Sequence, residues 1–268
     1  MKAESLRKSL DPAKRLALAL DVPTMIEALG LARRLSGKVG FFKVGLELFV
    51  AEGPVILWAL KCVAPDSGIF LDLKFHDIPA TVGKAMAAIK NCPMDLVSVH
   101  AQGGPDMIKA AVAMAGEALV LGVTVLTSLD PGALGELSGE SREPGAYAAL
   151  LAQRAIGAGC GGLVCSSQET ADFRARFGPG PFLVTPGIRP DWVSVANDDQ
   201  KRIGTVSSAI AMGSDLLVIG RPIREAKDPV EACDRVLEEI AQGLKKRDKP
   251  SGMKVSQAIK KLGPPKGK

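Results

Sequence analysis

The sequence predicts a single (β/α)8 barrel, the TIM-barrel fold, and three observations favour it. Eight short apolar segments alternate with helix-like segments, and parallel strands need such crossover helices. The composition does not shift partway along the chain, as it would between two domains. Polar residues end almost every apolar segment, and a barrel gathers the ends of its strands on one functional face. A doubly wound open sheet shares the alternation and is the alternative.

In the first half of the chain, each expected strand is an apolar run that ends at a polar or charged residue. The run 16–20 leads into Asp21, and Pro23-Thr24 begins a helical pattern that continues to Leu35. The next three runs repeat this arrangement and end at Lys43, at Asp72 and Lys74, and at His100. We expect those strands at 39–44, 69–74 and 95–100, with helices at 46–63, up to about 90, and 107–118.

The second half continues the alternation and adds one long connection. A fifth strand is expected at 119–126, ending at Thr127-Ser128, and an irregular connection with Pro131, Gly135 and Gly139 follows it. Glycine and proline in such a segment favour loops. The remaining strands are expected at 162–165, 182–185 and 216–219, and the remaining helices at 147–158, 168–177, 206–212 and 230–244.

Composition and charge indicate a folded cytoplasmic protein. Hydrophobic residues make up 47% and charged residues 24% of the chain, as in globular proteins. No apolar run reaches membrane-spanning length, and residues 1–13 lack the apolar core of a secretory signal. We assign 1–13 to an N-terminal extension, 14–244 to the catalytic barrel and 245–268 to a flexible tail. The net charge is +5, but the tail alone carries +8, and a solvated extension is favoured over a nucleic-acid contact.

The cysteines and histidines give no metal or disulfide pattern. No CxxC pair is present, and only two histidines could assist. We therefore expect buried, reduced thiols, and we expect His76 and His100 to be packed core residues rather than catalysts. The cysteines are Cys62, Cys92, Cys160, Cys165 and Cys233.

The densest charge pattern is the stretch 70–81, Phe-Leu-Asp-Leu-Lys-Phe-His-Asp-Ile-Pro-Ala-Thr. Residues two apart on a strand share a face, so Asp72 and Lys74 emerge together at the end of the third strand. Asp77 stands where the following helix begins, and Pro79 stiffens that exit. Alternating charges at the end of an apolar strand are costly to desolvate unless they pair or serve chemistry. A surface ion-pair cluster is the alternative.

Lysines held among carboxylates stay protonated, because opposite charges favour the charged form. Lys74, with Lys43 nearby, would then be a proton donor and not a Schiff-base nucleophile. A fixed anion at Asp72 beside this acid suits a decarboxylation: the anion disfavours a substrate carboxylate, and the ammonium protonates the carbon left behind. No pyridoxal phosphate or thiamine motif is evident, so we expect no cofactor and no metal, and catalysis by preorganised charge.

A phosphate site is expected after the last two strands. Gly220 lets the backbone approach an anion after the eighth strand, and Arg221 offers a bidentate guanidinium. Arg189 and Gln200 bracket a polar segment after the seventh strand, which reads as a lid over the same anion.

With these motifs in place, the sequence resembles the orotidine 5′-phosphate decarboxylase family. The resemblance rests on the stretch 70–81 together with Ala19-Leu20-Asp21, Phe42-Lys43-Val44-Gly45, Val125-Leu126-Thr127-Ser128, Thr185-Pro186-Gly187-Ile188-Arg189 and Val218-Ile219-Gly220-Arg221-Pro222. It covers about residues 16–244. Ala80 stands where many relatives have asparagine, and the basic tail lies outside the match.

The resemblance implies a role for each motif. Lys43, Asp72, Lys74 and Asp77 would form the charged network, with Lys74 protonating C6 of the substrate as orotidine 5′-phosphate becomes UMP. Asp21 and Lys43 would hold the ribose, and Thr127 the pyrimidine. Gln200, Arg221, Gly220 and Arg189 would hold the phosphate, with 190–199 as the lid. The segment along the substrate would be Asp72, Leu73, Lys74, Phe75, His76, Asp77, Ile78, Pro79, Ala80 and Thr81. The family forms homodimers, in which Asp77, Ile78 and Thr81 would enter the partner's site.

Two alternatives remain open from the residues. A related barrel could be a Mg²⁺-dependent sugar-phosphate decarboxylase or aldol-type synthase, because a lone DxKxxD pattern is shared with such enzymes. A non-enzymatic barrel could bind nucleotides or RNA through its basic tail.

Overall fold

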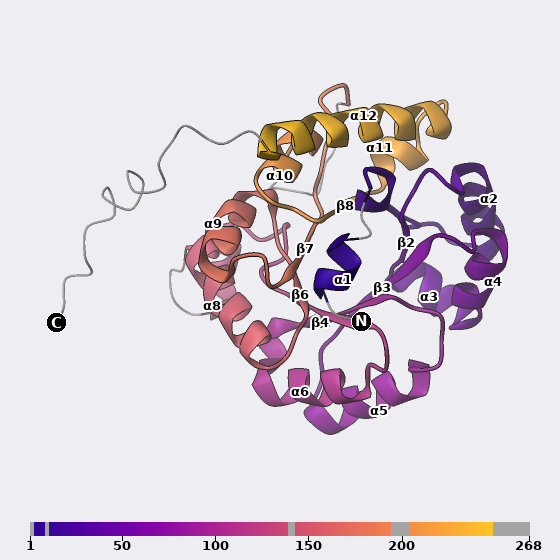
Figure 1. The fold of residues 1–268 in the computed structure, drawn as a ribbon. Helices are drawn as coiled ribbons and strands as arrows, with labels where there is room; N and C mark the ends of the chain where they lie inside the picture. The colour runs from indigo at the N-terminus through magenta and orange to yellow at the C-terminus, as the bar shows by residue number, and fades with distance from the viewer. Residues whose placement is uncertain (1–2, 9–10, 139–142, 194–203, 249–268) are drawn as a thin grey trace.

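The computed structural model describes residues 3–8, 11–138, 143–193 and 204–248, and it is a closed eight-stranded barrel (Figure 1). All neighbouring strands are parallel, and β8 pairs with β1 to close the sheet. The predicted (β/α)8 fold is therefore confirmed, and the doubly wound alternative is wrong. The strands are β1 Leu16–Ala19, β2 Phe41–Val44, β3 Gly68–Phe75, β4 Leu96–His100, β5 Leu119–Val123, β6 Gly162–Val164, β7 Phe182–Thr185 and β8 Leu216–Ile219.

The helices surround the sheet, and several of them differ from the prediction. The predicted helix 46–63 is divided, because Gly53 adopts a left-handed φ of 68° that ends one helix and Pro54 begins the next. The expected loop after β5 contains a helix, since its proline is at the first helical position, where proline is tolerated. The last helix extends to Asp248, so residues 245–248 of the predicted tail belong to it.

The outer helices are α2 Met25–Leu35, α3 Leu46–Glu52, α4 Val55–Val63, α5 Pro79–Ile89, α6 Gly104–Met114, α7 Pro131–Ser138, α8 Pro144–Gly157, α9 Ser167–Phe177, α10 Val206–Ala211, α11 Arg221–Arg224 and α12 Pro229–Asp248. Two single turns, η1 Ala13–Arg15 and η2 Ala101–Gly103, precede β1 and follow β4. None of the helices in the described ranges is both long and apolar enough to cross a membrane.

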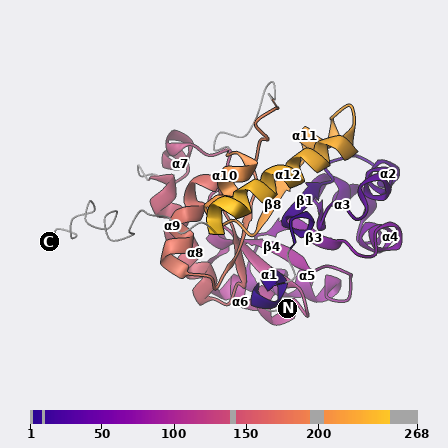
Figure 2. The ribbon, with the colours of Figure 1, turned by 45° about the horizontal axis from the view of Figure 1, so that its top comes forward.

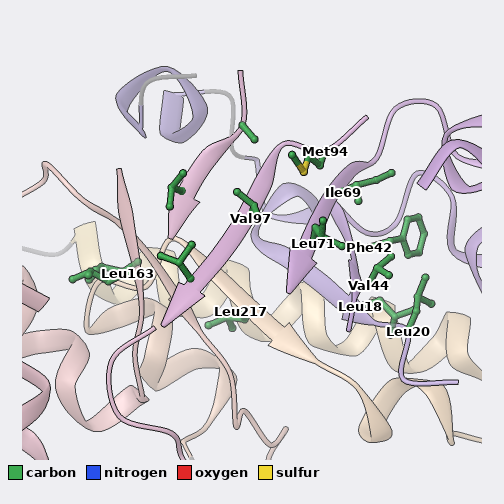
Figure 3. Packing of buried hydrophobic residues seen from close by; sticks show 14 of the residues in the cluster. Leu18, Leu20, Phe42, Val44, Ile69, Leu71, Met94, Val97, Leu163 and Leu217 are labelled. Carbon is green, nitrogen blue, oxygen red and sulfur yellow. The ribbon is translucent and has the colours of Figure 1, made fainter. Parts of the chain in front are cut away.

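Successive side chains of each strand point to opposite faces of the sheet, and this divides the core into two layers. Residues such as Leu18, Phe42 and Leu71 belong to a large cluster with the helices (Figure 3). Their neighbours Ala19 and Phe70 belong to a second cluster of strand residues, which fills the barrel. Following this inward face along the strands leads to Asp21, Lys43 and Asp72. Because every second side chain of a strand faces the barrel interior, these charged residues lie together at the mouth of the barrel.

The opposite mouth is covered by α1, Ala3–Lys8, which lies over the barrel axis (Figures 1 and 2). Leu6 is buried with the inner cluster. Arg7 donates to both oxygens of Asp215, at 2.9 and 3.1 Å. The N-terminal extension of the prediction thus contains a helix that is packed against the barrel.

The cysteines depart from the expectation of uniform burial. All five are free thiols, and Cys160, Cys165 and Cys233 are buried. Burial raises the pKa of each of these three thiols to about 12. The prediction is wrong for Cys62, which is exposed, and for Cys92, which is partly exposed.

Candidate active site

A cavity of about 550 Å³ opens among the carboxyl ends of the strands. Its floor is the last inward layer of the barrel, including Ala19, Phe70 and Val218. Eight of the predicted site residues line this single cavity: Asp21, Lys43, Asp72, Lys74, Thr127, Arg189, Gly220 and Arg221. Gln200 lies outside the residues that the structure describes.

Four of these side chains form a continuous charged row across three strands. Lys43 Nζ lies 2.9 Å from Asp21 Oδ1 and 3.8 Å from Asp72 Oδ2. Lys74 Nζ donates to the same Asp72 oxygen at 2.9 Å. The row alternates in sign, from Asp21 through Lys43 and Asp72 to Lys74. Asp72 therefore accepts from the lysine of its own strand and faces the lysine of the neighbouring strand.

The row is buried in the middle and open at its ends. The Lys43 and Asp72 side chains are each 10% exposed, whereas Lys74 is 33% and Asp21 50% exposed. Burial by itself raises the pKa of Asp72, but Lys43, Lys74 and hydrogen bonds from Lys74 and Ser98 hold that pKa below its ordinary value. Asp72 is thus a carboxylate at neutral pH, and a lysine ammonium is held beside it.

Gly45 keeps space above this row. A Cβ at this position would lie 3.0 Å from Lys43 Nζ and 3.1 Å from Asp21 Oδ1. Contacts this short would require the ion pair to shift. The glycine after β2 therefore leaves the ammonium and carboxylate accessible from the cavity.

Arginines that follow β7 and β8 border the cavity. Arg221 begins α11 directly after Gly220, and Arg189 follows β7. A Cβ on Gly220 would lie 3.3 Å from the Ala19 side chain, so the close approach of β8 to β1 favours glycine here. Arg224 also lines the cavity, and its buried Nε has no hydrogen-bond partner among the residues that the structure describes. This margin can bind an anion through guanidinium groups.

The segment after Lys74 does not line the cavity of its own chain. Leu73 and Phe75 are partly buried and pack against the outer core. His76, Asp77, Ile78, Pro79, Ala80 and Thr81 are all exposed. Asp77 accepts a hydrogen bond from the N–H of Ile78 at 2.6 Å. Within one subunit, Asp77 is therefore separate from the row formed by Asp21, Lys43, Asp72 and Lys74.

The two histidines have different surroundings. His100 is buried at the end of β4, its Nδ1 accepts from the N–H of Gln102, and its ring stacks on His76 with 5.2 Å between centroids. Burial, His76 and Lys74 lower the pKa of His100 to about 4. The prediction of a packed residue is confirmed for His100. It is wrong for His76, which is exposed.

Sequence reasoning missed several residues of the site. Glu47, Ser128 and Arg224 line the cavity, and Ser98 Oγ donates to Asp72 Oδ1 at 2.8 Å. Arg224 stands three residues after Arg221, so its spacing on a helical turn was a usable signal. Ser98 lies two residues from Leu96 and from His100 on β4, which places it on the inward face. A serine in an apolar strand gave no further signal.

The fold and site together define a class of protein. It is a (β/α)8-barrel enzyme whose catalytic face combines an alternating lysine–carboxylate row with arginines after the last two strands. The chain belongs to the orotidine 5′-phosphate decarboxylase / HUMPS family, whose sequence model matches residues 14–236.

Individual relatives agree with this assignment over most of the chain. An orotidine 5′-phosphate decarboxylase of Anaeromyxobacter sp. (strain K) is 47% identical, over 88% of this chain and 100% of the relative. That of Thermobifida fusca (strain YX) is 44% identical, over 85% of this chain and 96% of the relative. The crystal structure of orotidine 5′-phosphate decarboxylase from Lactobacillus acidophilus has a TM-score of 0.73 and 31% identity, covering 84% of this chain and 98% of that one.

Proposed function

We propose that this protein decarboxylates orotidine 5′-phosphate to UMP in de novo pyrimidine biosynthesis, without a cofactor. One observation carries the proposal: a single cavity joins the row Asp21, Lys43, Asp72 and Lys74 to the arginine margin of Arg189 and Arg221. A substrate with a carboxylate at one end and a phosphate at the other has complementary groups for both parts.

The reacting carboxylate would lie beside Asp72 and Lys74. The bond between C6 and the carboxylate breaks, carbon dioxide leaves, and the electron pair remains on C6. Lys74 Nζ then gives its proton to C6, becomes a neutral amine and regains a proton from solvent. Asp72 is already held ionised by its partners, so it raises the energy of the nearby substrate anion while the lysine ammonium groups stabilise the developing carbanion.

The rest of the substrate would fill the space between the two parts. Asp21 and Lys43 bind the ribose hydroxyls, since one presents an acceptor and the other a donor toward the cavity. Thr127 contacts the pyrimidine. The Gly220 backbone, Arg189, Arg221 and, beyond the described residues, Gln200 bind the phosphate.

Binding of the phosphate would be coupled to closure of the segment 190–199. Residues 190–193, the part of this segment that the structure describes, contact α12. Trp192 Nε1 donates to Glu239 at 2.9 Å, and Arg235 lies 4.1 Å from the centre of the Trp192 ring. A phosphate far from C6 can in this way increase turnover, because its binding energy orders the site around the reacting carbon.

A second subunit would complete the site. Ile78 is 66% exposed although it is a large apolar residue, and Asp77 and Thr81 beside it are also exposed. Exposed apolar and charged residues grouped in this way suit an isologous dimer interface. In a homodimer, Asp77, Ile78 and Thr81 would reach the partner's substrate and extend its charged row.

The decisive experiment follows the ultraviolet absorbance of orotidine 5′-phosphate with purified protein and no added cofactor. We expect turnover that EDTA does not reduce. Loss of activity with EDTA and its return with Mg²⁺ would favour the sugar-phosphate alternative, and no turnover at all would refute the proposal. A protein truncated after residue 248 is expected to keep this activity, because the truncation leaves every described element intact.

The dimer is tested by mixing two inactive variants, Lys74→Ala and Asp77→Ala. Hybrid dimers contain one site with both groups intact, so random exchange of subunits restores about a quarter of wild-type activity. If Asp77 acts within its own chain, no mixture recovers activity.

A further inference from the structure

The ladder between β3 and β4 is interrupted at the charged row. Leu71 pairs with Val97, and the next pair is Phe75 with Val99. Residues 72–74 therefore stand opposite Ser98 alone. Such an irregularity bends a strand and re-aims its side chains, and it leaves backbone groups without their ordinary ladder partners.

The backbone of Lys74 adopts an unusual conformation at this interruption. Its φ is 51°, and it is the only non-glycine residue with positive φ in the described ranges. A left-handed conformation is unfavourable for a lysine and persists only where surrounding contacts hold it. The N–H of Lys74 donates to Ser98 Oγ at 2.9 Å, so the serine hydroxyl replaces the missing ladder partner.

The same hydroxyl also fixes the neighbouring carboxylate. Ser98 Oγ donates to Asp72 Oδ1 at 2.8 Å, and the other oxygen, Oδ2, accepts from Lys74 Nζ at 2.9 Å. Ser98 is fully buried and does not line the cavity. One hydroxyl, which can both accept and donate, thus holds the backbone of the lysine and the side-chain orientation of the aspartate.

We propose that Ser98 is a positioning residue that sets the Asp72–Lys74 pair in its reactive geometry without touching the substrate. This inference rests on the proposed decarboxylation. It follows that Ser98 contributes to turnover rather than to phosphate affinity, because the arginine margin lies apart from β4. A displacement of about 1 Å in a catalytic group can reduce a rate by roughly 10²-fold.

The test compares Ser98→Thr with Ser98→Val, two variants of nearly equal shape that differ by the hydroxyl. We expect Ser98→Val and Ser98→Ala to lose about 10–100-fold in kcat with KM changed less than about threefold, and Ser98→Thr to keep most of its turnover. Ser67→Ala is the matched control, since Ser67 is a buried serine whose hydroxyl donates to Val39 O at the other end of β3. It should retain wild-type kcat.

A pH profile separates positioning from general weakening of the fold. Removing the Ser98 hydrogen bond takes away one of the contacts that hold the pKa of Asp72 low, so its pKa rises. The acid limb of kcat should therefore move to higher pH in Ser98→Ala. A purely structural defect lowers kcat at every pH and leaves the pH of the acid limb unchanged. The titratable groups near this carboxylate are Asp21, Lys43, Lys74 and His100.

Binding of UMP and the circular dichroism spectrum show whether each variant is folded with an intact product site. The proposal would be overturned by any of three results. These are equal losses of kcat in Ser98→Thr and Ser98→Val, a change in KM alone, or wild-type kcat in Ser98→Val. Failure of the proposed function is recognised separately, because then the wild type and Ser67→Ala do not turn over orotidine 5′-phosphate either. In that case the carboxyl titration of Asp72, followed by NMR in wild type and Ser98→Ala, still tests the role of the hydroxyl.

Discussion

The two mouths of the barrel each bury a carboxylate against two basic side chains, and they differ in how completely it is satisfied. At the mouth covered by α1, here called the base of the barrel, Asp215 accepts from Arg7, from Arg174 at 2.8 Å and from the N–H of Leu183 at 3.0 Å. Asp215 is 1% exposed. At the catalytic mouth, Asp72 accepts from Lys74 and Ser98 and faces Lys43 at 3.8 Å.

The cations differ even more than the carboxylates. Arg7 and Arg174 direct further N–H groups to carbonyl oxygens of the chain, among them Pro181 O and Gly213 O. Lys74 Nζ makes one hydrogen bond within the described part of the chain and borders the cavity. An ammonium has three donors, so Lys74 retains donors for a ligand. Similar charges thus hold the chain together at one mouth and remain available for chemistry at the other.

The largest expected effect comes from removing the available ammonium. Lys74→Ala should reduce kcat by at least about 10⁴-fold, because it removes a proton donor and a stabilising charge together. Its melting temperature should stay within a few degrees of wild type. Absorbance kinetics and thermal unfolding measure the two quantities. Lys109→Ala removes an exposed lysine on α6 and should leave both unchanged. Near-normal turnover of Lys74→Ala would mean that the proton comes from another group.

The reverse pattern is expected at the base. Asp215→Asn leaves two guanidinium groups facing a neutral amide, and breaking a buried ion pair costs about 3–5 kcal/mol of unfolding free energy. Turnover of the folded fraction should be unaffected, since the base is separated from the cavity by the inner core. Urea unfolding provides the measurement. Asp234→Asn, which removes an exposed pair with Lys38, should cost less than about 1 kcal/mol. A variant Asp215→Asn that is as stable as wild type would contradict the structural role of the base.

The same contrast explains what could be predicted from the sequence. Asp72 and Lys74 are two residues apart on one strand, and Asp21 and Lys43 end neighbouring strands, so local periodicity and barrel topology were enough to bring them together. Arg7 and Asp215 are 208 residues apart, and no local pattern relates them. Their pairing depends on α1 covering the barrel, which required the three-dimensional structure.

Departures from regular geometry were also beyond the sequence. The interruption between β3 and β4 depends on register, and register is not visible in either strand alone. For the same reason the left-handed Lys74 and the role of Ser98 were not predicted. Asp77 follows Lys74 by three residues, yet the chain turns away after β3 and leaves Asp77 outside its own cavity.

A smaller effect is expected at the arginine margin of the catalytic mouth. Arg221→Ala should weaken binding of the phosphate by about 2–4 kcal/mol if the guanidinium becomes buried against it, and stability should change little. The KM for orotidine 5′-phosphate and the affinity for UMP both report this loss. Arg176→Ala, which removes an exposed pair with Asp172 on α9, is the control. An unchanged KM and UMP affinity would show that the phosphate binds elsewhere.

The smallest expected effect is a difference between the two mouths in how they make the free energy of unfolding depend on pH. His100 has its pKa lowered from 6.5 to about 4 in the folded protein. The unfolded chain therefore binds more protons between these values, so the free energy of unfolding falls as pH decreases through this window and is fully recovered above it. We expect a loss of about 1–2 kcal/mol between pH 7.5 and 5 that His100→Asn removes.

Urea unfolding at the two pH values measures this difference, and Asp215→Asn provides the comparison with the base. Because that substitution leaves His100 in place, its stability should keep the wild-type pH dependence while lying lower at both pH values. A wild type and His100→Asn that lose the same stability would assign the pH dependence to other groups. A pH dependence removed by His100→Asn and retained by Asp215→Asn would locate proton-linked stability at the catalytic mouth, beside the lysine that is proposed to donate a proton.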